Sequence, residues 1–101
     1  MMPPHVNRFV PGHGETHTGD DLVIEGYTLE YAGEDPVLVD DETGDAIAFT
    51  STLEETRQDR GTGLPGSVQY KGVMRITTTG LVSGRRYRLS FLGDEITFTA
   101  G

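Results

Sequence analysis

Apolar and polar residues alternate along several short segments of this chain. The alternation is clearest in residues 47–53, 87–91 and 96–100, and shorter apolar runs occupy residues 22–24 and 37–39. Successive side chains of a strand point to opposite faces, so a period of two is typical of strands with one buried face. Residues 27–31 and 68–79 continue this pattern, which gives about seven short strands separated by turn residues. We therefore predict an all-β, antiparallel, two-sheet sandwich.

The same pattern predicts core residues and loops. Phe49, Leu89 and Phe91 lie on alternating apolar sets, so we expect their side chains to be buried. Residues 54–66 are charged and rich in glycine, which favours a long loop. Gly72 interrupts the pattern of its strand, and it marks either a bulge or a change of strand. No segment of ten or more residues has the period of an amphipathic helix.

Residues 1–20 differ from the rest of the chain. They contain three prolines, three glycines and all three histidines, and neither the strand period nor the helix period appears. We expect an extended N-terminal arm that precedes a single sandwich domain at 21–101. Phe9, Val10 and Pro11 form the one apolar stretch of this arm, and they are candidates to bind a partner.

Leu81, Gly84 and Tyr87 have the spacing of a tyrosine corner, a feature of Greek-key sandwiches. At such a corner the glycine permits a tight turn, and the tyrosine hydroxyl bonds to backbone upstream. The motif refines the expected fold to an immunoglobulin-like sandwich, and it gives Tyr87 a structural role.

Composition limits where the chain works. Its 101 residues suit one domain, and it has no cysteine with which to form disulfides. No apolar run approaches the roughly 20 residues that span a bilayer, and no signal peptide is visible. The formal net charge of −8 argues against sequence-independent binding to nucleic acid. We expect a protein of the cytoplasm, or of a particle assembled there, without membrane or nucleic-acid partners.

Charge is divided unevenly along the chain. Residues 1–56 hold thirteen acidic side chains and a single basic one, whereas residues 57–101 hold seven basic and three acidic side chains. The two halves either neutralise each other within one sandwich or meet the opposite charge on a neighbouring copy. On the second interpretation, five arginines are candidate assembly residues: Arg57, Arg60, Arg85, Arg86 and Arg88. The alternative for these arginines is a solvated sheet face.

Candidate chemistry is sparse. The glycines at 61, 63 and 66 match a dinucleotide-binding pattern in spacing, but a proline lies inside it and a strand follows where a helix is needed. His13, Glu15 and His17, and separately the acidic turn at 40–45, contain metal-ligating residue types, and a metal role for either stays open. No nucleophile motif is present. We expect no cofactor and no enzymatic activity.

The order of features from Gly19 to Gly101 resembles small immunoglobulin-like virion proteins of tailed bacteriophages. The resemblance rests on the opening Gly19-Asp20-Asp21-Leu22, the hairpin from residue 37 to 44, and the closing strand 84–91 with its following hairpin. It is a likeness of layout, and related layouts occur in head-decoration, neck and baseplate proteins. It implies a structural virion protein that binds the major capsid or other virion proteins as a homo-oligomer or in a lattice. It carries no catalytic residues.

A carbohydrate-binding or adhesion module is the alternative function. Sugar sites on sandwiches usually present exposed aromatic side chains. This chain has no tryptophan, and most of its tyrosines and phenylalanines occupy alternating positions that we expect to face the core. The pattern thus favours the virion protein over the adhesion module.

Overall fold

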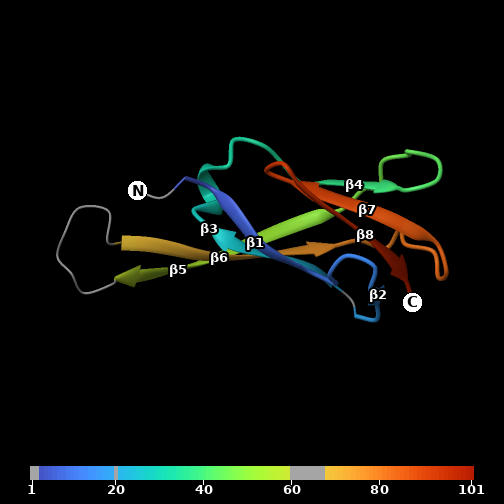
Figure 1. The fold of residues 1–101 in the computed structure, drawn as a ribbon, viewed down its shortest axis with the longest axis horizontal. Coiled ribbons are helices and arrows are strands. Elements are labelled where there is room, and N and C mark those ends of the chain that lie inside the picture. Colours follow the sequence, from blue (N-terminus) through green and yellow to red (C-terminus); the bar gives the residue numbers. More distant parts are fainter. Residues whose placement is uncertain (1–2, 20, 60–67) are drawn as a thin grey trace.

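The computed structural model describes residues 3–19, 21–59 and 68–101, and these form two four-stranded sheets (Figure 1). In the first sheet the order is β1 (His5–Val10), β3 (Asp21–Tyr27), β6 (Val68–Thr77) and β5 (Thr50–Asp59), all antiparallel. The second sheet has the order β2 (Thr16–His17), β8 (Asp94–Ala100), β7 (Arg86–Phe91) and β4 (Val37–Asp40), with β2 parallel to β8. The all-β prediction is confirmed, with eight described strands in place of about seven.

One hydrophobic core lies between the two sheets. Alternate residues of each central strand are buried, and they come together as a single cluster. Its fully buried members from the first sheet are Leu22, Ile24 and Ile76, and those from the second sheet include Leu38, Leu89 and Phe98. The predicted core residues Leu89 and Phe91 are buried. Phe49 is only partly buried, because it precedes β5 and packs at the margin of the core.

The segment expected as an extended arm is part of the sandwich, which corrects the interpretation of its described residues. Residues 5–10 form the edge strand β1 and pair with β3, while residues 16–17 pair with β8. The register of β1 shifts between Val6 and Arg8, and this shift breaks the alternation by which a strand is recognised. Phe9 is 8% exposed and belongs to the core. The sequence alone did not reveal which residues of the same domain Phe9 packs against.

Two other expected segments also differ from the prediction. β3 ends at Tyr27, and residues Leu29–Tyr31 form a short 3₁₀ helix, η1, in place of a continued strand. Thr28 has a left-handed backbone with φ of 58°, which a strand cannot accommodate. β5 continues to Asp59 through residues expected to be a loop. Because β5 is the edge of its sheet, solvent lies beside it and charged residues are tolerated there.

The β5–β6 hairpin extends past the rest of the first sheet and makes the molecule elongated, at 49 × 23 × 22 Å (Figure 1). At its base Gly26 and Gly72 are direct cross-strand partners, and the register of β6 runs through Gly72 without the predicted interruption. Leu29 of η1 packs on both glycines. A Cβ on Gly72 would lie 3.2 Å from Leu29, and one on Gly26 only 2.2 Å from the His5 carbonyl oxygen. These glycines therefore let η1 cover the sheet where the second sheet ends.

No helix in the described part of the chain has the length and apolar character needed to cross a membrane.

Candidate functional site

Tyr87 fastens the corner that leads into β7. Its side chain is 1% exposed, and its hydroxyl oxygen accepts a hydrogen bond of 2.7 Å from the backbone N–H of Val82. Gly84 turns the chain with φ of 86°, and Leu81 packs partly buried against the core. This is the backbone bond expected of a tyrosine corner. The three residues thus act in the fold, at the start of the strand that carries Arg86 and Arg88.

The three residues of the candidate apolar anchor, 9–11, differ in their exposure to solvent. Phe9 and Pro11 are buried within the sandwich, and only Val10, at 39% exposed, reaches the surface. Phe9 points inward because it lies opposite Ile24, an inward-facing residue of β3. A partner can therefore contact Val10 alone of the three without disturbing the core.

Two of the three arginines at 85–88 are held by acidic side chains of the same domain. Arg85 pairs with Asp40 at 2.7 Å, and Arg88 lies 3.9 Å from Asp41. Backbone N–H groups of Glu42 and then Thr43, followed by the Arg85 guanidinium, hold the pKa of Asp40 below its usual value despite burial. Asp40 in turn raises the pKa of Arg85. These contacts indicate that the two halves of the chain neutralise each other here.

The remaining candidate arginines that the structure describes belong to strands of different sheets. Arg86 is exposed on β7, opposite Thr99 of β8. Arg57 belongs to β5 in the other sheet, opposite Tyr70, and Arg60 lies outside the described residues. Among the residues that the structure describes, no acidic side chain forms an ion pair with the exposed Arg86, unlike Arg85 and Arg88.

The candidate metal ligands of the N-terminal segment have separate roles. The Nδ1 atom of His13 accepts a hydrogen bond of 3.1 Å from the Thr97 backbone N–H. Glu15 accepts one from the backbone of Gly12, and the His17 ring lies edge-on to Phe98. Within residues 3–19, 21–59 and 68–101, no group of three or more such side chains converges on a common point.

In the acidic turn at 40–45, the carboxylate of Asp40 holds the backbone. Oδ1 of Asp40 accepts hydrogen bonds from the N–H groups of Glu42 at 2.9 Å and Thr43 at 3.2 Å. This is the local bonding by which aspartate stabilises a turn. The carboxylate is therefore already engaged by the turn and by Arg85.

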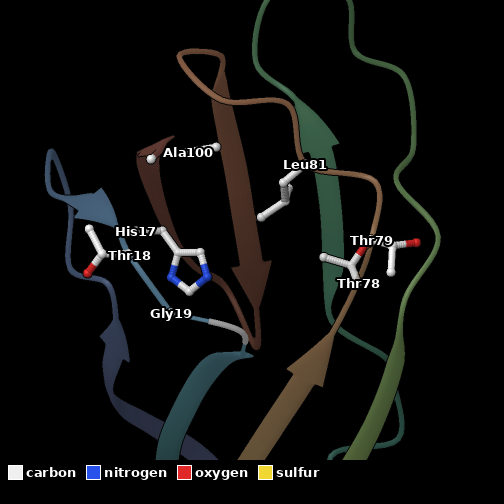
Figure 2. A pocket seen from close by; sticks show the side chains of 8 residues that line it. His17, Thr18, Gly19, Thr78, Thr79, Leu81 and Ala100 are labelled. Carbon is white, nitrogen blue, oxygen red and sulfur yellow. The ribbon is translucent and has the colours of Figure 1, made fainter.

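A hollow of about 430 Å³ opens at the end of the sandwich where β8 finishes (Figure 2). Three segments distant in sequence line it, and they contribute residues 17–19, then 78, 79 and 81, and finally 100–101. Its polar groups are threonine hydroxyls and the His17 imidazole, with Leu81 and Ala100 adding apolar surface. These groups suit hydrogen bonds to a polar ligand. This hollow could not be predicted from the sequence, because its lining has no local motif.

An aromatic and acidic surface lies at η1, where a buried strand face was expected. Tyr31 is 58% exposed, and the backbone N–H of Glu30 donates to the Glu55 carboxylate at 3.2 Å. Burial first, and then the charge of Glu30, raise the pKa of Glu55. A hydrogen bond to Glu30 and its charge raise the pKa of Tyr31. The expectation that the tyrosines face the core is wrong for Tyr31.

The chain matches no family model, no curated protein and no solved structure in comparisons with known proteins.

Proposed function

We propose that this protein is an immunoglobulin-like structural component of a tailed bacteriophage virion, without enzymatic activity. The leading role is decoration or stabilisation of the capsid, and the second is that of a neck or baseplate adaptor. The major capsid protein or another virion protein is the expected partner. The assembled virion is the expected location.

The strand order is the observation that carries this proposal. Treated as two halves of one strand that changes sheets, β1 and β2 complete an immunoglobulin pattern. The order β1-β3-β6-β5 then corresponds to strands A-B-E-D, and β8-β7-β4 to G-F-C. The tyrosine corner begins β7, which is the F strand where such corners occur. This strand order supports the resemblance of the chain to small immunoglobulin-like virion proteins of tailed phages.

The surface also suits assembly. The elongated hairpin presents strand backbone beyond the sandwich, and Arg86 is available to an acidic neighbour. An exposed ion pair contributes only about 0–1 kcal/mol, so repeated copies must supply most of the affinity. Charge then acts mainly on the rate of association and on register.

A particle-binding assay tests the proposal. Tailed particles are prepared from the strain that carries the gene after the gene is deleted, and purified full-length protein is added before sedimentation. We expect co-sedimentation, with slower association at low salt for Arg86→Ala. Arg75→Ala is the matched control, because Arg75 is exposed on the other sheet. Failure of the full-length protein to bind heads, necks or tails would refute the proposal.

The exposed Tyr31 favours a carbohydrate-binding or adhesion module as the second candidate. A sugar ring stacks on an exposed aromatic face, and carboxylates such as Glu30 and Glu55 accept hydrogen bonds from its hydroxyls. A glycan array probed with the wild-type protein and Tyr31→Ala tests this function. Binding that is lost in the variant supports it, and an array without binding excludes it for the glycans displayed.

A further inference from the structure

A groove of about 370 Å³ lies between the edge strand β1 and the start of β8. The buried side chains of Phe9 and Ile96 close its bottom, and the half-buried Val6 lines its wall. The groove exists because the chain leaves the first sheet after β1 and joins the second sheet only at β2, where Thr16 lies opposite Thr99 (Figure 1). Between these two points the sandwich is open on this side.

The backbone of β8 at Glu95 turns toward this groove. In a strand, the N–H and C=O groups of successive residues point to alternate sides. The Thr99 N–H donates to the Glu15 carbonyl oxygen at 3.1 Å, so Thr99 turns its backbone away from β7. The Thr97 carbonyl oxygen likewise accepts from the N–H of Gly14 at 2.8 Å. Because the register of β8 with β7 is continuous, Glu95 turns the same way, and it has no backbone partner on that side among the described residues.

This chain covers the same edge of β8 only as far as Thr97. The Thr97 N–H donates to Nδ1 of His13 at 3.1 Å, so the His13 ring takes the place that a carbonyl oxygen of a neighbouring strand would fill. His13 also lines the groove and closes one end of it. A segment laid in the groove beyond His13 would continue the edge by pairing with both backbone groups of Glu95.

The rim of the groove is acidic. Asp94 and Glu95 are exposed, and no cation among the described residues forms an ion pair with either. Arg8 also lines the groove, but its guanidinium pairs with Glu25. Asp94 is two residues from Ile96 and shares its face of β8, so the carboxylate lies next to the apolar bottom. The rim therefore attracts a basic group, as does the net charge of −8.

We propose that this groove binds an extended, basic peptide segment of a partner protein, which adds a strand to β8 at Glu95. The backbone of the segment pairs with the N–H and C=O of Glu95. An apolar side chain of the segment lies against Val6, and a lysine or arginine two positions along, on the same strand face, meets Asp94. The contact is short, so we expect a dissociation constant of about 0.1–1 mM for an isolated peptide. The proposal goes beyond the role in a virion and does not depend on it.

A titration of the ¹⁵N-labelled full-length protein with a synthetic peptide, followed by NMR, tests the groove. The probe is acetyl-Lys-Thr-Leu-Thr-Lys-amide, in which the leucine and both lysines share one strand face and the order is the same in either direction. We expect saturable shifts of the amide signals of Val6, Glu95 and Ile96. A peptide with glutamate in place of both lysines is expected not to bind. A peptide N-methylated at every residue keeps the charges but loses the donors for strand pairing, so it is expected to bind about tenfold more weakly.

Paired substitutions test the acidic rim. Asp94→Asn together with Glu95→Gln removes two charges and is expected to weaken binding about three- to tenfold. Glu42→Gln together with Asp45→Asn is the matched control, because it removes the same charge from exposed side chains at the opposite end of β7, and it should bind as the wild type does.

An absence of shifts with up to about 5 mM probe peptide would overturn the proposal. Shifts centred on other residues, equal binding of the acidic or the N-methylated peptide, or a rim variant that binds as tightly as its control would overturn it as well. Because this experiment contains no particles, its failure leaves the virion proposal standing.

Discussion

Removal of one hydroxyl group tests the role of the corner at β7. Tyr87→Phe keeps the ring, which packs near Phe98 at a centroid distance of 5.9 Å, and deletes only the acceptor of the Val82 N–H. The hydroxyl is in a side chain that is 1% exposed, so water cannot readily replace the lost bond. The hydrogen bond is part-buried, and leaving its N–H donor without this acceptor costs about 1–3 kcal/mol where water does not take the acceptor's place. For a domain of about 100 residues, each kcal/mol lowers Tm by roughly 4–8 °C.

Urea unfolding followed by far-ultraviolet circular dichroism measures this loss without relying on tyrosine fluorescence. Tyr31→Phe is the matched control, because its side chain is 58% exposed, and its unfolding free energy is expected to change by less than about 0.5 kcal/mol. If Tyr87→Phe and Tyr31→Phe unfold at the same urea concentration with the same slope, the hydrogen bond to Val82 does not support the corner.

Three further changes test other parts of the account. Phe91→Ala removes a core side chain that is 2% exposed and should lower the unfolding free energy by about 3–5 kcal/mol; a loss under about 1 kcal/mol in urea would mean the core is assigned wrongly. Gly26→Ala forces a Cβ against backbone and should cost about 1–3 kcal/mol or more, whereas a Cβ at Gly19 would lie 3.7 Å from the His17 ring, so Gly19→Ala should melt close to wild type. The hydrogen bond from the backbone N–H of Glu42 is the main cause that lowers the pKa of Asp40 in the folded protein. The ionised Asp40 carboxylate therefore stabilises the fold at pH values above its unfolded pKa near 3.8, and this stabilisation is lost as the pH falls through the lower folded pKa. Asp40→Asn should therefore flatten the acid limb of a pH-dependent melting series, and an unchanged limb would contradict this.

The strands that the sequence predicted well are those with one buried face. In β7 and β8 every second residue is buried, so their alternation survives in the sequence. β1 was not predicted, because its register shift and the following Pro11 interrupt the alternation of buried and exposed residues. The outer part of β5 was not predicted, because a run of charged residues on an edge strand has the same composition as a loop.

The candidate sites were harder to predict than the strands, for a physical reason. The motif of Leu81, Gly84 and Tyr87 is local, and its key bond spans only five residues. The pairing of Arg85 with Asp40 joins residues 45 positions apart, so only the packing of β4 against β7 brings them together. The hollow at His17 likewise depends on three separate segments. Such surfaces follow from topology, which a local pattern does not contain.

The protein content of purified virions tests the proposed function most directly. Tailed particles from the strain that carries the gene are purified by density gradient and digested for quantitative mass spectrometry. The account predicts that peptides of this chain are present in a fixed ratio to the major capsid or tail proteins through every purification step. Their loss from particles that retain intact heads and tails would contradict it.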